Sequence, residues 1–377
     1  MAKLKLEELC EFITDGTHQT PEYCDEGGFL FLSSKDVTSR KIDWDHAKRI
    51  PADLHEKLYA RLSPRKNDIL LAKNGTTGVA ALVDRDELFD VYVSLAVLRP
   101  KETVYPPYLL YAINSPTANK QFAAGLKGIG VPNLHLNVIR KTQVQIPTYN
   151  EQREICTLLN SALAVIEKRR KQLSALDDLI KARFVEMFGD EECKMQLSEV
   201  CSIITDGTHQ PPQFVSDGIP FIFVSNITGN KVTYDAEKFI DQSTYNELIK
   251  RTPIEIGDVL LSTVGSYGHP AVVKSDTKFL FQRHIAYLKP KKELVDSDFL
   301  HGAILSPDAQ RQIEEGVKGI AQKTLNLSEI KRITIPVPEL CKQKAFAAFV
   351  AQIDKSKFAL MRMLHQISIS QRQEWTI

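Results

Sequence analysis

The chain has 377 residues, of which 43% are hydrophobic and 25% charged, a composition ordinary for a folded protein and a length sufficient for two domains. No segment approaches the ~20 apolar residues that cross a bilayer, and glutamates interrupt residues 1–12, so the N-terminus is not a signal peptide and we expect a cytoplasmic protein. The 48 basic and 47 acidic residues leave a net charge of +1. A nucleic-acid binder of this composition needs locally clustered basic residues or help from a partner.

Six cysteines stand at positions 10, 24, 156, 193, 201 and 341. None belongs to a C-x-x-C pair, and no pair of histidines completes a zinc pattern, so we expect no metal site. Cys10 and Cys201 occupy equivalent places in the repeat described next. This equivalence favours reduced side chains that pack in a core over disulfide partners.

The chain contains an internal duplication. Residues 13–21 read ITDGTHQTP and residues 204–212 read ITDGTHQPP, identical at eight of nine positions with an offset of 191. Further blocks keep an offset of 190 to 192, among them NDILLAKNGTTGVAALV (67–83) with GDVLLSTVGSYGHPAVV (257–273), and NLHLNVIRKTQVQIP (133–147) with TLNLSEIKRITIPVP (324–338). A unit of about half the chain has therefore been copied in tandem.

Each copy shows the same order of predicted elements. In the first copy, the loop at 14–19 precedes β-rich runs at 69–71, 79–83 and 91–98, a helical region around 108–124 and a short strand that ends in Ile-Pro at 146–147. These patterns predict two mixed α/β domains, at 1–150 and 189–341.

Each domain is followed by a segment whose apolar residues have helical periodicity. In 151–188 and 342–377, apolar residues recur in steps of three and four, which predicts two long amphipathic helices with a heptad-like seam. The first would be roughly 57 Å long at 1.5 Å per residue. We favour an antiparallel two-helix spacer with pseudo-two-fold symmetry over the alternative that each helix docks independently on its own domain.

The order of these motifs resembles the specificity subunit of Type I restriction–modification systems. The resemblance rests on T-D-G-T-H (14–18 and 205–209), on D-I-L-L and D-V-L-L with downstream glycines (68–78 and 258–268), on Ile-Pro followed by E-Q-R (146–147 and 151–153), and on K-A-R-F-V-E-M-F-G (181–189). No single motif is specific, but their order is repeated and covers nearly the whole chain.

The resemblance implies a mechanism. The two domains would be target-recognition domains, each reading one half of a bipartite, asymmetric site in double-stranded DNA, and the helices would set the spacer between the halves. Methylation subunits would dock on the helical regions, and restriction subunits would complete the assembly. S-adenosylmethionine, ATP and magnesium are expected on these partners only, and no cofactor is expected on this chain.

Two other functions compete with this one. A duplicated protein–protein adaptor without a DNA role would suit the net charge near zero. A recognition fragment of a single-chain restriction–methylation enzyme fits less well, because no catalytic motif is present: the sequence lacks a phosphate-binding G-x-x-x-x-G-K-[ST] loop and a G-x-G-x-x-G turn. The segment Y-P-P-Y (105–108) lacks the leading Asn or Asp of an amino-methyltransferase signature, and we predict a turn before a helix there.

Residues identical in both copies cannot distinguish two half-sites. For 14–19 and 205–210, the favoured interpretation is a turn fixed by Asp-Gly, with partner docking or phosphate contact as the alternative and catalysis by His18 or His209 as a minor one. Base reading is expected from the loops that differ, against the alternative of solvated glycine hairpins. These candidates are Lys73, Asn74, Thr76 and Thr77 in the first copy and Ser262, Thr263, Ser266, Tyr267 and His269 in the second.

Basic positions kept in both copies are candidates for phosphate contact, which fixes register without reading sequence. Taken singly, a residue of this kind is more often a solvated surface charge, so the candidates are considered as a set. The pairs are Lys41/Lys231, Arg61/Arg251, Lys127/Lys318, Arg140/Lys331 and Lys141/Arg332.

Overall fold

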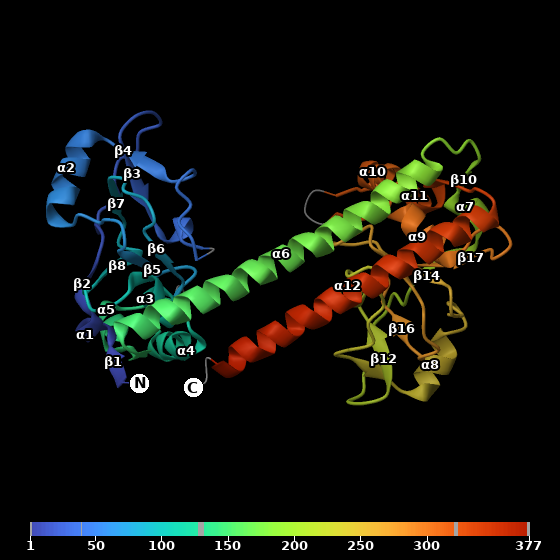
Figure 1. The fold of residues 1–377 in the computed structure, drawn as a ribbon. Coiled ribbons are helices and arrows are strands. Elements are labelled where there is room, and N and C mark those ends of the chain that lie inside the picture. Colours follow the sequence, from blue (N-terminus) through green and yellow to red (C-terminus); the bar gives the residue numbers. More distant parts are fainter. Residues whose placement is uncertain (1, 39, 127–131, 320–322, 375–377) are drawn as a thin grey trace. The chain divides into compact units, whose positions relative to one another are not determined.

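The computed structural model describes residues 2–38, 40–126, 132–319 and 323–374. The chain divides into two compact units: unit 1 comprises Met1–Glu167 with Gln366–Ile377, and unit 2 comprises Lys168–His365. Two long helices, α6 (Tyr149–Phe188) and α12 (Leu340–Glu374), cross this division without a break (Figure 1). Within the described residues, no helix has the length and apolar character needed to cross a bilayer.

Unit 1 is built from three small sheets. The antiparallel four-stranded sheet has the order β2 (Cys10–Asp15), β8 (Leu95–Pro100), β5 (Ile69–Ala72) and β6 (Ala80–Leu82). A three-stranded sheet has the order β4 (Lys48–Ile50), β3 (Phe29–Leu32) and β7 (Phe89–Val91), with β3 and β7 parallel. Strand β1 (Ala2–Lys5) pairs with β9 (Gln143–Ile146). The helices are α1 (Leu6–Leu9), α2 (Ala52–Arg61), α3 (Pro106–Ile113), α4 (Pro116–Gly125) and α5 (Leu136–Lys141), with a 3-10 turn at Ser34–Asp36.

Both faces of the four-stranded sheet are buried, which explains the continuous apolar run of β5. Ile69 and Leu71 pack against α3, α4 and α5, whereas Leu70 and Ala72 pack against the three-stranded sheet. Alternate side chains of a strand point to opposite faces, so a strand between two layers buries the side chains of both faces and is predominantly apolar. Unit 1 therefore has three layers, with the four-stranded sheet in the middle.

Unit 2 repeats this architecture. Its four-stranded sheet has the order β11 (Cys201–Asp206), β17 (Ile285–Pro290), β14 (Val259–Ser262) and β15 (Pro270–Val272). Its three-stranded sheet has the order β13 (Phe239–Ile240), β12 (Ile219–Ile222) and β16 (Leu280–Phe281), and β10 (Lys194–Gln196) pairs with β18 (Thr334–Pro336). The helices are α7 (Leu197–Val200), α8 (Gln242–Leu248), α9 (Ser297–Ile304), α10 (Pro307–Gly316) and α11 (Leu327–Arg332), with a 3-10 turn at Val224–Asn226.

The two units agree in fine detail. A register shift follows Cys10 in the pairing of β2 with β8, and another follows Cys201 in the pairing of β11 with β17. Both cysteines are free and buried, and burial raises the pKa of each thiol to about 12. They are reduced packing residues, as the repeat predicts. The expected mixed α/β fold with a duplicated domain is confirmed.

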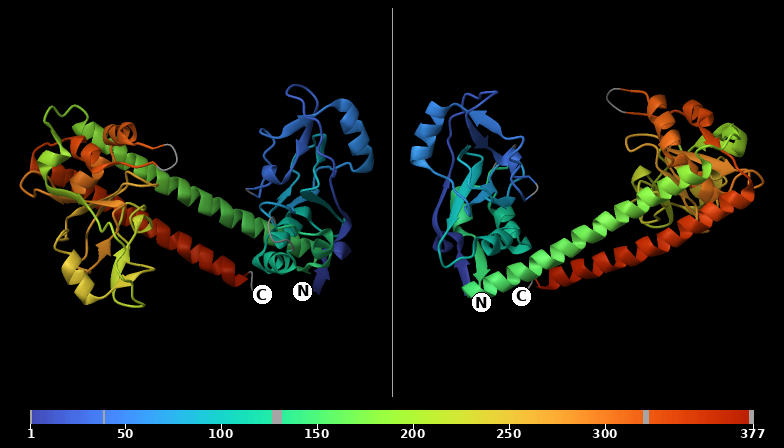
Figure 2. Two further views of the ribbon diagram at one scale, coloured as in Figure 1. Left: turned by 180° about the vertical axis from the view of Figure 1, so that it is seen from behind. Right: turned by 45° about the horizontal axis from the view of Figure 1, so that its top comes forward.

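In unit 2, α6 and α12 run antiparallel and side by side (Figures 1 and 2). Lys357 forms an ion pair with Asp177, and further along the pair the guanidinium of Arg183 lies 5.9 Å from the ring centre of Phe349. Residue numbers rise along α6 while those of the contacted residues in α12 fall, which shows that the helices are antiparallel. Direct contact between the two helices therefore exists, and both also pack on the α/β core of unit 2.

A cluster of four phenylalanines fastens the helices to that core. Phe184 and Phe188 of α6, Phe299 of α9 and Phe346 of α12 are all buried, and every pair of their ring centres lies within 6.2 Å. A Cβ atom on Gly302 would lie 2.5 Å from the ring of Phe346, so the ring packs directly on the α9 backbone. The two phenylalanines of the K-A-R-F-V-E-M-F-G motif thus have a packing role.

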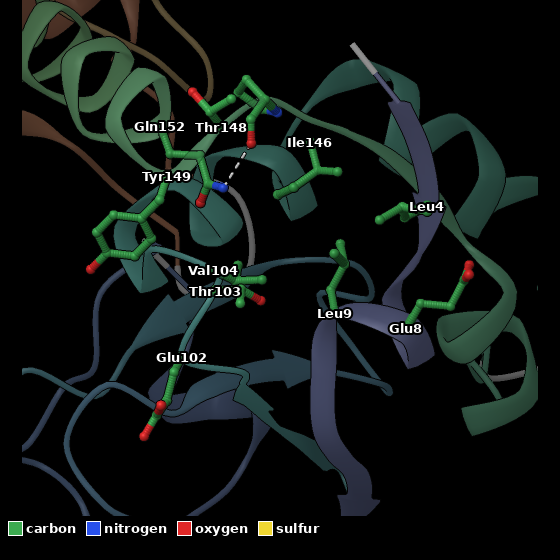
Figure 3. A pocket seen from close by; sticks show the side chains of 11 residues that line it. Leu4, Glu8, Leu9, Glu102, Thr103, Val104, Ile146, Thr148, Tyr149 and Gln152 are labelled. Atoms are coloured by element: carbon green, nitrogen blue, oxygen red, sulfur yellow. Dashed lines mark hydrogen bonds between the residues drawn. The ribbon is translucent and has the colours of Figure 1, made fainter.

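One buried glutamine at the start of each long helix joins that helix to its unit. The Gln152 side chain accepts a hydrogen bond from the N–H of Tyr105 at 2.7 Å. It donates one to the carbonyl of Pro147 at 3.0 Å (Figure 3). Its counterpart Gln343 accepts from the N–H of Asp296 and donates to two backbone carbonyls. The amide group, with an acceptor and two donors, satisfies backbone groups on both sides of the junction. Tyr105 directly precedes α3, so Y-P-P-Y forms a turn and helix start, as predicted.

Replacing Gln343 by leucine keeps the volume of the side chain but removes its hydrogen bonds. We expect Gln343→Leu to lower the free energy of unfolding by about 1–3 kcal/mol, because the N–H of Asp296 and the carbonyls of Leu294 and Pro338 lose a partner. Urea denaturation measures the change, and Lys344→Leu at the next, exposed position is the control. Equal stability of the two variants would contradict a junction role for the amide.

Candidate nucleic-acid interface

The T-D-G-T-H loop follows the first strand of each four-stranded sheet and crosses the end of the three-stranded sheet. Thr17 donates its N–H to the carbonyl of Val91 at 3.0 Å and accepts from the N–H of Val93 at 2.9 Å. Thr208 bonds in the same way with Phe281 and Arg283. The chains approach so closely that a Cβ atom on Gly16 would lie 1.8 Å from the Val91 carbonyl oxygen, and one on Gly207 would lie 2.3 Å from that of Phe281. Only glycine fits here.

The aspartate of the loop is held by a different cation in each unit. In unit 1, a carboxylate oxygen of Asp15 lies 2.5 Å from the ammonium of Lys73, and both side chains are largely buried. In unit 2, the carboxylate of Asp206 lies 2.5 Å from the guanidinium of Arg251, which is half exposed. Arg61, the counterpart of Arg251, instead donates to the backbone carbonyl of Asp15 at 3.1 Å. The favoured interpretation, a locally bonded turn, agrees with this geometry.

The two loop histidines are exposed. His18 lies 3.5 Å and His209 lies 2.7 Å from the aspartate of its own loop, with side chains 73% and 51% exposed. Each exposed histidine therefore contacts a carboxylate that is itself largely buried within its own loop. The described residues contain no group of three or more His, Cys, Asp or Glu arranged to hold a metal ion.

The structure divides the nine predicted base-reading residues by exposure. Lys73, Ser262 and Thr263 are 6%, 0% and 5% exposed. The Ser262 hydroxyl accepts from the N–H of His269 at 2.9 Å, and the Lys73 ammonium pairs with Asp15. A side chain in this state cannot reach a base without leaving its partner. The burial of these three residues favours a structural role for them, and base reading by the loop stays a prediction.

The remaining loop residues are more accessible. Thr76 and Ser266 are exposed at equivalent loop tips, whereas Asn74, Thr77, Tyr267 and His269 are half buried. The Thr77 hydroxyl donates to the carbonyl of Gly75, and His269 lies 3.2 Å from the side chain of Asn230. The ring of Tyr267 packs on the core of unit 2, with the ammonium of Lys323 6.0 Å from its centre.

Asn74 is distinctive among them. Its backbone forms a bridge with Asn133, and the side-chain oxygens of both residues are buried without a hydrogen-bond partner among the described residues. The corresponding bridge in unit 2 joins Val264 and Thr324. A pair of amides in unit 1 is therefore replaced by a valine and a threonine in unit 2.

A second variable segment was missed by the sequence prediction. The turn between the two sheets reads Tyr92-Val93-Ser94 in unit 1 and Gln282-Arg283-His284 in unit 2. It bonds to the T-D-G-T-H loop on one side and to the glycine loop on the other, through the N–H of Lys73 to Ser94 and of Thr263 to His284. The sequence could have indicated this segment, because all three of its residues differ between the two copies.

The retained basic residues occupy several places. Arg61 and Arg251 reach the T-D-G-T-H loop, and Arg140 donates to the carbonyl of Ile13 at 2.7 Å near the same loop. The other exposed members lie elsewhere. Lys41 and Lys231 follow the 3-10 turns, and Lys318 and Arg332 lie 3.4 Å and 3.7 Å from Glu329. Lys141 ends α5, and Lys331 lies in the last turn of α11. Lys127 lies outside the described residues.

A hollow at the start of α6 has the wrong charge for a nucleic acid. It measures about 530 Å³ and has an apolar lining that includes Leu9, Val104 and Ile146 (Figure 3). Two carboxylates, those of Glu8 and Glu102, also border it. Acidic groups repel phosphate, so this hollow is not part of the candidate interface.

Two copies with a constant backbone and different side chains at one end of the sheet define a recognition protein. A family model described as the Type I restriction modification DNA specificity domain matches residues 1–175 and again residues 191–367. The chain belongs to this family. The duplicated match has the same two-part organisation as the internal repeat.

Similar proteins agree with this membership. The Type I restriction enzyme EcoBI specificity subunit of Escherichia coli is 24% identical over 280 residues, a match that covers 66% of this chain and 57% of that protein. The MjaVIII specificity subunit of Methanocaldococcus jannaschii is 21% identical, over 77% of this chain and 72% of its own. A chain solved in a study of complex assembly and conformational transition of the type I R-M system superposes with a TM-score of 0.58 at 19% identity, covering 100% of this chain and 95% of that one.

The loop aspartates offer a matched pair of variants. We expect Asp15→Ala to destabilise unit 1 by about 3–5 kcal/mol, because it leaves the buried ammonium of Lys73 unpaired. Asp206→Ala should cost at most about 1 kcal/mol in unit 2, since Arg251 is half exposed and water replaces its partner. Hydrogen exchange of strands β5 and β14 reports each unit separately. Equal loss of protection in the two strands would show that burial of the cation does not decide the effect.

Proposed function

We propose that this chain is the sequence-reading, non-catalytic subunit of a Type I restriction–modification complex. Each unit reads one half of a bipartite site in double-stranded DNA, and the site is asymmetric because the two units differ in their accessible side chains. The observation that carries the proposal is the contrast at one end of the sheets: an identical T-D-G-T-H loop supports a turn and a glycine loop whose side chains differ between units. The family match supports a DNA-specificity role and gives no support to an adaptor without one.

The proposal assigns the chemistry to partners. Methylation subunits would dock on the helical regions and supply S-adenosylmethionine and adenine methylation, and restriction subunits would supply ATP- and magnesium-dependent steps. The complex would work in the cytoplasm, where the DNA of bacteria and archaea lies. A partner would also supply part of the DNA affinity, which suits the net charge of +1.

The helices are proposed to set the spacer between the half-sites. Helix α6 runs unbroken through 40 residues, a length of roughly 60 Å. A continuous helix transmits direction and separation along its length, which a flexible linker cannot do. The buried glutamines support this role, because they fix the start of each helix to its unit.

Selection from a randomised pool of DNA duplexes tests the recognition function. In the presence of methylation subunits, the chain should enrich a motif with two separated parts, and methylation-aware sequencing of the host genome should report the same motif. Enrichment of no motif, at low salt and with partner present, would contradict the DNA reading and favour the adaptor function.

A deletion tests the spacer function. Removing four residues between 165 and 175, close to one helical turn, shortens α6 by about 6 Å and should change the preferred spacer by about one or two base pairs. The double variant Lys168→Ala/Arg170→Ala, which alters exposed residues without changing length, is the control and should keep the spacer. An unchanged spacer in the deletion variant would show that the helices do not set it.

A further inference from the structure

The turn Gln282-Arg283-His284 joins β16 to β17 at the end of the sheets in unit 2. Its backbone is held on both sides, since Arg283 donates its N–H to the carbonyl of Thr208 at 3.0 Å and His284 accepts from the N–H of Thr263 at 3.0 Å. The side chains do not make these bonds. The turn can therefore carry different side chains without a change in its path, which is the property required of a segment that reads sequence.

The turn borders a hollow of about 420 Å³ in unit 2. Its lining comes from the T-D-G-T-H loop, the glycine loop, the turn and the residues before α11. Within it, Asp206 is already paired with Arg251, and Thr263 is buried. The accessible polar side chains include those of Arg283, His284 and Asn326.

Arg283 is the exposed cation of this hollow. Among the described residues no carboxylate oxygen lies within 4.0 Å of its guanidinium, whereas Arg251 and Arg311 of the same unit are ion-paired with Asp206 and Asp308. Its Nε lies 3.4 Å from Nε2 of His284. Burial, and then the charge of Arg283, lower the pKa of His284, so the imidazole is neutral at physiological pH and does not repel a second donor or a base. With Nε engaged by His284, the two terminal nitrogens of the guanidinium remain available as donors, since neither has a hydrogen-bond partner among the described residues.

We propose that Arg283 reads a guanine in the major groove of the half-site bound by unit 2. This inference rests on the proposed DNA-recognition function and names a base and a residue for it. A guanidinium donates two parallel hydrogen bonds to O6 and N7 of guanine, the pattern that distinguishes guanine from the other bases in that groove. His284, beside it in the hollow, positions the guanidinium through the contact at Nε.

Unit 1 supplies the contrast. The position of Arg283 is occupied by Val93, whose side chain makes no hydrogen bond, and that of His284 by Ser94, which is 6% exposed and accepts the N–H of Ser34 at 3.0 Å. This turn cannot read guanine in the same way. Loss of the Arg283 contact should therefore alter one half-site and leave the other unchanged.

The experiment compares wild-type chain, Arg283→Ala and Arg283→Lys, each with methylation subunits, by selection from randomised duplexes and by binding to the selected site. We expect Arg283→Ala to lose the guanine preference at one position of one half-site and to reduce discrimination there by roughly 5- to 150-fold. Arg283→Lys keeps a charge and donors and should retain part of the preference. Arg311→Ala, an exposed arginine of the same unit, is the control and should leave the motif intact.

Three results would overturn the inference while leaving DNA recognition in place. The wild-type motif could lack guanine in the half-site bound by unit 2, Arg283→Ala could keep every base preference, or the variant could bind all duplexes more weakly by one factor, as a lost phosphate contact would do. Enrichment of no motif by the wild-type chain would instead overturn the proposed function itself. Thermal unfolding of Arg283→Ala confirms that the exposed substitution leaves the fold intact.

Discussion

The recognition end of each unit depends on a crossing of two backbones where no side chain fits. Gly16 in unit 1 and Gly207 in unit 2 pass so close to the last residue of β7 or β16 that a Cβ atom would overlap a carbonyl oxygen. The hydrogen bonds made there by Thr17 and Thr208 fix the path of the following turn through backbone groups alone. Since no side chain is needed to hold the turn, its side chains are free to differ.

The same separation of scaffold and variable surface runs through the rest of each unit. The strands at D-I-L-L and D-V-L-L are buried on both faces and are apolar apart from Ser262, whereas the loop tips that follow them are exposed. Even the retained aspartate has changed its partner, from buried Lys73 in unit 1 to half-exposed Arg251 in unit 2. Identity of a residue between the copies therefore does not mean identity of its energetic role.

The long helices are tied to the units by few, buried contacts. Gln152 and Gln343 hold the helix starts through backbone hydrogen bonds, and four phenylalanines pack the end of α6 and the start of α12 on α9 in unit 2. Buried amides are specific in direction because their donors and acceptors must all be satisfied. The start of each helix is therefore fixed in direction relative to its own unit.

Much of this organisation was decided by the sequence alone. The repeat, the β-rich runs and the two long helices could be predicted because they depend on local periodicity and on matching residues such as 13–21 and 204–212. Exposure within the loops could not be predicted. Lys73 is buried beside Asp15, and the Ser262 hydroxyl accepts from the N–H of His269. Thr263 donates its N–H to the carbonyl of His284. The pairing of distant strands brings Arg283 beside the glycine loop. Which side chain of a loop faces solvent depends on contacts far apart in the chain, and only the tertiary structure determines them.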